Sequence, residues 1–272
     1  MSDAGNDAGI PVVMAFSGAD PTGGAGLAAD IEAASSMGCH LAPVTTAITV
    51  QDTSRVLRYQ AVEGALVVEQ ARAVLEDMPV GAFKLGMLGS VRNVEIVHTV
   101  LRDYPDIPVV LDPVLASGGG VSLADEAVRQ AMVTLLIPQT TILTPNSREV
   151  RSLAPEADSI DACAQELLGY GCDYVLVTGS HEETPAVENR LYGNMRKLDS
   201  WSWERLPEEY HGSGCTLAAA IAALLAHGNE PYSAVQEAQE YCWHALAAGY
   251  RPGMGQLLPN RFYWSGNRRA ED

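Results

Sequence analysis

A glycine-rich turn in the last third of the chain has the residues to bind an anion. The segment Tyr210–Leu217 contains Gly212, Ser213, Gly214 and Thr216, and it runs directly into an apolar stretch with helical spacing. The first amides of a helix have no partner within the helix, and the helix dipole adds partial positive charge there. The pattern therefore predicts an anion site, such as a site for a phosphoryl group in transit.

Cys215 lies in the first turn of that predicted helix. A thiol in such a position tends to have a lowered pKa, so that a thiolate becomes available as a base or a nucleophile. The alternative interpretation is an ordinary junction of loop and helix that contains a small buried cysteine. Taken alone, the turn favours the ordinary junction, because such short motifs often occur without the function.

Polar or functional side chains also follow most of the predicted strands. In an open parallel sheet, ligands bind beyond the carboxyl ends of the strands, so residues stationed there are candidates for a shared site. Each of them has an alternative role as a turn residue, since Asp-Pro and Pro-Asn pairs punctuate loops. The strand ends carry Asp20, Gln51, Met87, Asp112, Asn146 and Thr178.

The elements that would position these residues alternate along the chain. Short β-branched runs predict strands over 11–17, 41–50, 82–85, 108–111, 141–143 and 174–177. Helical patterns cover 27–37, 65–77, 91–102, 124–136, 147–153, 160–170, a stretch from Gly214 onward and 233–248. This order predicts an α/β fold built from βαβ units around a mostly parallel sheet. Residues 190–194 and 197–203 predict an antiparallel pair at one edge of that sheet.

A second glycine-rich segment matches a nucleotide-binding pattern only in part. Residues 24–29 fit GxGxxG/A after a strand, and Asp52 ends the second strand, as in dinucleotide-binding folds. Residues 18–23 are inserted between the strand and the motif, whereas a dinucleotide-binding turn is tight. A nicotinamide-dependent dehydrogenase is therefore a distant alternative, and the sequence also lacks the GxxxxGK[ST] pattern of a P-loop.

Composition sets the broad class. The 272 residues suit one large domain or two small ones, and without a linker or a repeat we expect one domain over 11–272 after a flexible N-terminus, 1–10. The net charge of −17 argues against a nucleic-acid partner. The N-terminus shows no leader pattern, and the chain has no long apolar run. We therefore expect a cytoplasmic protein without a membrane partner. Five scattered cysteines suggest neither a disulfide framework nor a zinc site, and the chain has only two lysines, Lys84 and Lys197.

Taken together, these residues resemble a known family, the hydroxymethylpyrimidine/phosphomethylpyrimidine kinases of thiamin biosynthesis within the ribokinase-like kinases. Six blocks occur in the order typical of that family, over about residues 12–228. They are 17–30, 50–53, 84–88, 111–114, 144–149 and 211–216. The resemblance implies a three-layer α/β/α sandwich and a homodimer. It also implies ATP- and Mg²⁺-dependent phosphorylation of an aminopyrimidine alcohol and then of its monophosphate.

The resemblance also assigns roles to residues by position. Gln51 would bind the edge of the aminopyrimidine, whose adjacent donor and acceptor suit an amide. Asp30 would contact the hydroxymethyl group, and Asp112 with Glu149 would hold Mg²⁺ largely through water. The other substrate residues would be Gly18, Ala25, Met87 and Val114, the ATP residues would be Asn146, Thr178 and His181, and the anion site would be Gly212, Ser213, Gly214 and Cys215.

Two positions depart from the pattern of the family. Ser213 replaces a threonine of the anion turn and keeps a hydroxyl group. Thr178 stands where many relatives carry a lysine that would neutralise nucleotide phosphate, so His181, Arg190 or the metal would have to supply that charge. Two alternative functions follow: a pyridoxal or pyridoxine kinase of the same fold, or a pyrimidine-binding regulator without catalysis.

Overall fold

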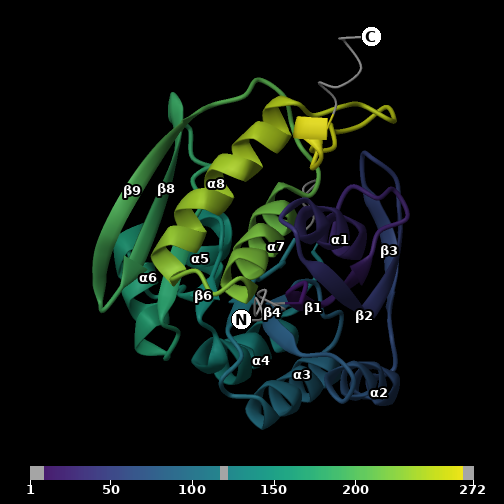
Figure 1. Ribbon diagram of the computed structural model, residues 1–272. Coiled ribbons are helices and arrows are strands. Elements are labelled where there is room, and N and C mark those ends of the chain that lie inside the picture. Colours follow the sequence, from purple (N-terminus) through teal and green to yellow (C-terminus); the bar gives the residue numbers. More distant parts are fainter. Residues whose placement is uncertain (1–8, 117–121, 266–272) are drawn as a thin grey trace, which may run out of the picture.

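The computed structural model describes residues 9–116 and 122–265, so residues 1–8 of the predicted flexible N-terminus lie outside it. Its centre is a nine-stranded sheet with the order β3-β2-β1-β4-β5-β6-β7-β8-β9 (Figure 1). The strands are β1 Val12–Ala19, β2 His40–Gln51, β3 Val56–Ala61, β4 Val80–Leu85, β5 Val109–Leu111, β6 Ile142–Leu143, β7 Tyr174–Val177, β8 Ala186–Gly193 and β9 Arg196–Glu204.

Strands β1, β2, β4, β5, β6 and β7 are parallel, and both edges of the sheet are antiparallel. The β8–β9 edge was predicted, whereas β3 at the opposite edge was missed. β3 pairs with β2 through a turn in which the Asp52 carboxylate accepts the amides of Ser54 and Arg55, at 2.8 and 2.9 Å. Its periodicity is weak because Leu57 and Arg58 both face solvent at the edge. Asp52 is thus a turn residue, which weakens the dinucleotide-binding interpretation.

Helices cover both faces of the sheet and complete three layers (Figure 1). The helices are α1 Gly26–Ser36, α2 Gly64–Leu75, α3 Val91–Asp103, α4 Glu126–Ala131, α5 Ser147–Leu153, α6 Ile160–Gly169, α7 Ser213–Ala226 and α8 Pro231–Ala247. Met14 and Phe16 of β1 face the core beneath α2–α6, while Val13 and Ala15 face the core beneath α1, α7 and α8. Alternate side chains of one strand therefore serve two cores, which is why a central parallel strand is a continuous apolar run.

The predicted helix over 124–136 is not regular. α4 ends at Ala131 and continues as one π turn, Met132–Leu136, and one 3-10 turn, Ile137–Gln139. Pro138 lies in the 3-10 turn and has no N–H to donate to a helix. The other predicted helices agree with the structure to within a few residues. Within the described residues, no helix is both long and apolar enough to cross a membrane.

The chain after α8 folds back over the sheet end. Tyr250 pairs with Leu258, and the amides of Gly255 and Gln256 donate to Thr53, at 3.0 and 2.9 Å. This segment thereby covers the β2–β3 turn directly beside Gln51.

Candidate active site

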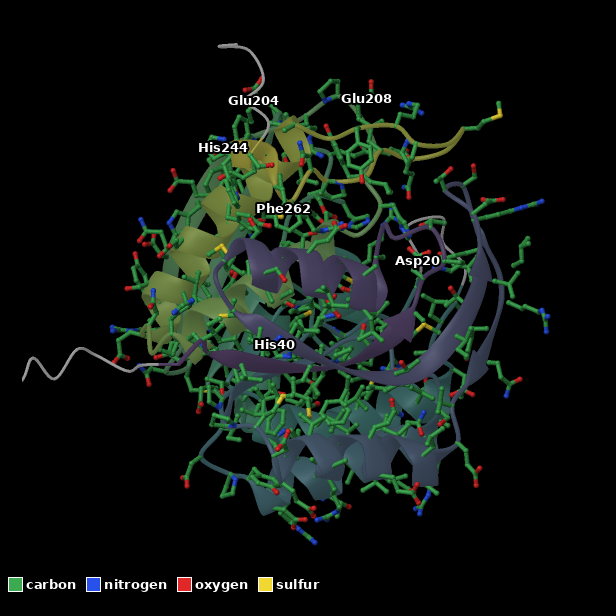
Figure 2. The ribbon with its side chains drawn as sticks, turned by 45° about the vertical axis from the view of Figure 1, so that its right-hand side comes forward. Asp20, His40, Glu204, Glu208, His244 and Phe262 are labelled. Carbon is green, nitrogen blue, oxygen red and sulfur yellow. The ribbon has the colours of Figure 1, made fainter. Side chains whose placement is uncertain are left out.

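The carboxyl end of the sheet carries all six predicted strand-end residues. Asp20, Asp112 and Thr178 each follow their strand directly, Gln51 closes β2, and Met87 and Asn146 lie within three residues of a strand end. Figure 2 shows Asp20 at this end of β1 and His40, the first residue of β2, at the other. An isolated bridge also joins Asn146 to Thr178. The placement predicted from the sequence is confirmed.

The predicted anion site is formed by the start of α7. Gly212 precedes the helix with a φ of 83°, and the first bond of the helix is from the Thr216 amide to the Gly212 carbonyl, at 3.0 Å. The His211 amide donates to Leu257. Among the described residues, the four amides of Gly212–Cys215 have no hydrogen-bond acceptor. Four unsatisfied donors at the positive end of a helix form a ready site for an anion.

Glycine is required where two loops meet beneath this site. A Cβ on Gly212 would lie 1.9 Å from the Gly24 carbonyl oxygen, and one on Gly26 would lie 2.1 Å from the Gly18 carbonyl oxygen. Both glycines also have positive φ values, 83° and 56°. The glycine-rich segment before α1 therefore packs directly against the anion turn, and any side chain would separate the two.

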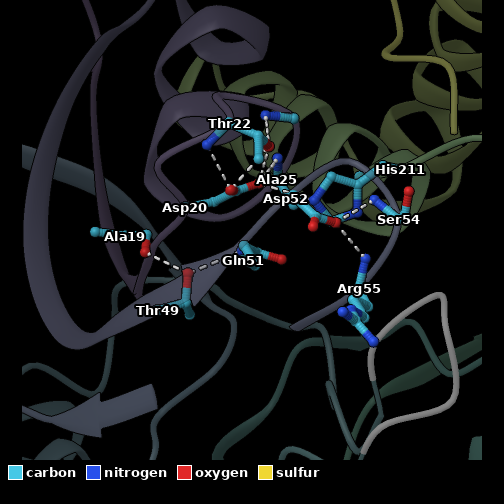
Figure 3. A network of polar contacts seen from close by, with 12 residues as sticks. Ala19, Asp20, Thr22, Ala25, Thr49, Gln51, Asp52, Ser54, Arg55 and His211 are labelled. Carbon is cyan, nitrogen blue, oxygen red and sulfur yellow. Dashed lines mark hydrogen bonds and ion pairs between the residues drawn. The ribbon is translucent and has the colours of Figure 1, made fainter. Parts of the chain in front are cut away.

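Asp20 ties these two loops together (Figure 3). Its carboxylate accepts the Thr22 amide at 2.8 Å, the Ala25 amide at 2.9 Å and a bond from His211 Nε2 at 2.8 Å. Burial opposes ionisation of Asp20, but the bonds from His211 and Thr22 outweigh it and lower its pKa. The sequence placed Asp20 at a strand end and His211 in the anion turn, 191 residues away, but it gave no sign that the two are paired.

Cys215 corrects one expectation from the sequence. Burial raises the pKa of its thiol to about 12, although the charge of Lys84 acts in the opposite direction. Cys215 therefore carries its proton at neutral pH, contrary to the lowered pKa expected at a helix N-terminus. The Asp112 carboxylate lies beside this turn, since a Cβ on Gly214 would be 3.5 Å from Asp112 Oδ2, and its negative charge also raises the pKa of Cys215.

Asp30 and Lys84 form an ion pair inside the protein. Both side chains are fully buried, and Lys84 Nζ lies 2.8 Å from Asp30 Oδ1 and 3.0 Å from Asp30 Oδ2. Burial would lower the pKa of Lys84, but the charges of Asp30 and of the groups around it, with the hydrogen bond to Asp30, together outweigh burial and raise the pKa. The predicted contact of Asp30 with a hydroxymethyl group is not favoured by this geometry, because the carboxylate is enclosed and already paired. Lys84, for which the sequence suggested no role, lies within electrostatic reach of Cys215 and Asp112.

Two neighbouring carboxyl groups, Asp112 and Glu149, have raised pKa values. Burial raises the pKa of Asp112 to about 6, although the charge of Lys84 acts in the opposite direction. Burial and the negative charge of Asp112 raise the pKa of Glu149 to about 8. A carboxyl pair in which one charge raises the pKa of the other fits a site for a hard divalent cation. Among the described residues no third His, Cys, Asp or Glu joins them, so a bound Mg²⁺ would complete its shell with water or phosphate.

The predicted nucleotide residues lie at the start of α5 and after β7. Asn146 caps α5 and forms a capping box with Glu149. Partial burial and the neighbouring Arg148 lower the pKa of His181, and Arg190 is ion paired with Glu188 at 3.1 Å. His181 is thus neutral at pH 7, and the charge of Arg190 is already balanced. Arg148 is exposed and has no ion-pair partner in the described part of the chain, so it is the better candidate to replace the missing lysine.

An apolar wall and one amide mark the predicted substrate side. Met87 packs in a small cluster with Ala47, Val56, Leu123 and the partly buried Val114. Its sulfur lies 3.4 Å from the position of a Cβ on Gly18, so Gly18 leaves room for Met87.

Gln51 stands at the open end of β2, where its Nε2 donates to Thr49 Oγ1 at 2.9 Å (Figure 3). Within the described residues its carbonyl oxygen has no donor. A hollow of about 310 Å³ at the opposite end of the sheet, lined in part by Pro108 and Thr141, contains none of these residues.

An α/β sandwich whose helix N-terminus faces paired carboxylates at the carboxyl ends of its strands defines a ribokinase-like small-molecule kinase. Solved structures support this class. The pyridoxal kinase of Staphylococcus aureus matches with a TM-score of 0.86 and 24% identity over 95% of this chain and 96% of that one. The phosphomethylpyrimidine kinase of Clostridium difficile matches with a TM-score of 0.74 and 30% identity over 86% and 98%.

Sequence comparison gives the family. The model of the phosphomethylpyrimidine kinase family matches residues 20–260, and the chain belongs to that family. The hydroxymethylpyrimidine/phosphomethylpyrimidine kinase of Streptomyces coelicolor is 34% identical over 253 residues, which are 90% of this chain and 92% of that protein. The protein of the same name from Mycobacterium tuberculosis is 36% identical over 251 residues, 90% and 91% of the two chains. The resemblance inferred from the sequence and the predicted fold class are both confirmed.

Proposed function

We propose that this protein transfers a phosphoryl group from ATP to the hydroxymethyl group of 4-amino-5-hydroxymethyl-2-methylpyrimidine, and then to the resulting monophosphate, in thiamin biosynthesis. The observation that carries the proposal is the set of four amides at Gly212–Cys215 that have no acceptor among the described residues, beside the buried Asp112 and the partly buried Glu149 at the same end of the sheet. Phosphoryl transfer depends mainly on positioning and on neutralisation of charge, and these groups supply both.

The pyrimidine would lie against Met87, with its donor and acceptor edge on the amide of Gln51. A primary amide offers one oxygen acceptor and two N–H donors, which match the neighbouring amino group and ring nitrogen. Val114 and Gly18 would complete the apolar wall, and Ala25 would border the same space.

The two acceptors differ in their need for a base. An alcohol must lose its proton, whereas a phosphate monoester, with a second pKa near 6, is already largely ionised at pH 7. Cys215 is too weak an acid to supply a thiolate at this pH. In the first transfer its sulfur would accept the alcohol proton while its own proton passes to the neighbouring Asp112 carboxylate.

Mg²⁺ would be held by Asp112 and Glu149 and would neutralise charge on the phosphoryl group in flight. The nucleotide would lie over Asn146 and Thr178, where Arg148 would neutralise phosphate in place of the absent lysine.

A coupled assay of ADP release with three acceptors tests the proposal. We expect turnover with the pyrimidine alcohol and with its monophosphate, at a much higher kcat/KM than with pyridoxal. Preferred turnover of pyridoxal would indicate a pyridoxal kinase instead. Binding of the pyrimidine without ADP release, with Mg²⁺ and ATP present, would indicate a non-catalytic binding protein and would refute the proposal.

A further inference from the structure

The C-terminal segment brings a buried guanidinium to the back of the anion site. Arg261 is only 1% exposed, and the Tyr241 hydroxyl donates to its carbonyl oxygen at 2.9 Å, which fixes its backbone on α8. A buried cation is retained only where its donors are satisfied, so the partners of Arg261 indicate what it does. The sequence suggested no role for this part of the chain.

The guanidinium joins three separate segments. Arg261 Nε donates to Thr216 Oγ1 at 2.9 Å, Nη2 donates to the Gly24 carbonyl at 2.6 Å, and Nη1 pairs with Glu32 at 2.9 Å. Thr216 lies in the first turn of α7, Gly24 lies in the glycine-rich loop, and Glu32 lies on α1. The planar, rigid arrangement of these donors sets the distance between the loop and the helix start, which a lysine could not do.

The hydroxyl group of Thr216 connects Arg261 to the anion site. Its hydroxyl accepts from Arg261 and donates to the Gly212 carbonyl at 2.8 Å. The Gly212 carbonyl and the Ser213 N–H belong to one planar peptide group and point in opposite directions. Because the carbonyl is held from behind, the Ser213 N–H is directed into the anion site. A chain of hydrogen bonds that begins at a cation also polarises each member, so that this N–H becomes a stronger donor.

We propose that Arg261 is a positioning residue for phosphoryl transfer, acting through Thr216 on the Gly212–Ser213 peptide. The inference rests on the proposed function of the anion site and adds the C-terminal segment to it. Arg261 contacts neither substrate nor nucleotide. Its removal therefore acts on the transition state more than on binding of the pyrimidine.

The primary test compares Thr216→Val with Thr216→Ser. Valine deletes the hydroxyl relay and keeps the shape, so we expect kcat to fall about tenfold while the KM for the pyrimidine alcohol changes little. Serine keeps the hydroxyl, and its kcat should stay near that of the wild type. Equal kcat values for valine and serine would overturn the inference.

Arg261→Lys and Glu32→Gln separate positioning from charge. Lysine keeps the cation but cannot bridge Thr216 and Gly24, so kcat should fall as in Thr216→Val, and the double variant Arg261→Lys/Thr216→Val should lose no more than either one. Glu32→Gln removes only the outer ion pair and should leave kcat unchanged. Additive losses in the double variant, or a lowered melting temperature with normal kcat in Arg261→Lys, would show that Arg261 serves stability alone.

A measurement without turnover keeps this inference separate from the proposed function. Inorganic phosphate should raise the melting temperature of the wild type and of Thr216→Ser, and should raise that of Thr216→Val less. If the wild type phosphorylates none of the alcohols, the proposed function fails, and the phosphate series alone decides whether the relay shapes an anion site. Equal stabilisation of all three proteins would count against the relay.

Discussion

The two halves of the proposed site are held in opposite ways. The anion half consists of the loop 20–26 and the first turn of α7, and the contacts that hold these two segments together lie within the chain, as the bond between Asp20 and His211 shows. The cation half consists of Asp112, Glu149 and the segments around Asn146 and Thr178. There, two neighbouring carboxyls have raised pKa values, and neither forms an ion pair within the described residues.

The difference indicates which part of the site exists before any ligand binds. The anion half is preorganised by contacts within the chain, so a substitution there should lower activity without changing the response to Mg²⁺. The cation half carries an electrostatic cost that a bound cation would relieve, so a substitution there should change the response to Mg²⁺ and to pH. Four predictions test this contrast, in order of decreasing effect.

Gly212→Ala should disrupt the packing of the anion half. The new Cβ would lie 1.9 Å from the Gly24 carbonyl oxygen, and φ is 83°. The helix start and the loop must then separate, and we expect kcat/KM to fall by about 10³-fold. Gly228→Ala is the matched control, since Gly228 has a φ of 87° but a Cβ there would meet no atom within 4 Å. The control should lose about 1–2 kcal/mol of unfolding free energy and keep its activity. Similar kinetics of the two variants would contradict the preorganisation argument.

Glu149→Gln should remove most of the response of the cation half to Mg²⁺. Both raised carboxyl pKa values mean that, between about pH 4 and pH 8, the folded state binds more protons than the unfolded state. The unfolding free energy of the metal-free wild type should therefore fall as pH rises through this range. In Glu149→Gln the fall should be smaller by about 1 kcal/mol or more, because glutamine removes the repulsion and keeps an acceptor for the Asn146 amide.

Urea unfolding at pH 5 and pH 8, with EDTA or with Mg²⁺, measures this effect. Mg²⁺ should stabilise the wild type more at pH 8 than at pH 5, and should stabilise Glu149→Gln little at either pH. The kcat of the variant should fall about 10²-fold. A variant that is less stable than the wild type at pH 8 without metal would show that Glu149 is not held under repulsion.

The contrast between the halves also explains what could be predicted from the sequence. Local patterns mark the strand ends and the glycine turn, because Gly212 and Asp112 stand beside the elements that position them. Contacts between residues that are far apart in the sequence leave no such local pattern. Asp20 with His211 and Asp30 with Lys84 join residues 191 and 54 positions apart, and both had to come from the fold.

The wrong expectation for Cys215 has a related cause. The lowered pKa was argued from the helix N-terminus, which is a local feature, whereas the pKa is controlled by burial and by the neighbouring carboxylates of Asp112 and Asp30. Burial of a single side chain depends on the packing of distant segments, and a sequence pattern does not report it. The edge strand β3 was missed for a similar reason, since its partner strand defines it more than its own residues do.

Cys215→Ala should separate the two transfers. We expect the first transfer, to the alcohol, to slow by about 10²-fold, and the second, to the monophosphate, to change much less, because only the alcohol needs a proton acceptor. Single-turnover assays with each acceptor measure the two rates. In the wild type, the rate of the first transfer should level off well below the pKa of the Cys215 thiol, since the Asp112 carboxylate would receive the proton. A rate that keeps rising toward pH 10 would instead indicate that the free Cys215 thiolate is the base.

Arg148→Ala should have the smallest effect, because Arg148 is exposed and the cost of losing its charge is screened by water. We expect the KM for ATP to rise about tenfold, with the KM for the pyrimidine alcohol unchanged. Thr178→Lys, added to the Arg148→Ala variant, should restore the lost affinity. It returns a cation beside Arg148, because the amide of Ser147 donates to the Thr178 carbonyl at 3.0 Å. Arg190→Ala is the matched control, since Arg190 is already paired with Glu188 and its loss should leave the KM for ATP near that of the wild type. A raised KM for ATP in Arg190→Ala, with no change in Arg148→Ala, would instead assign the phosphate contact to Arg190 on β8.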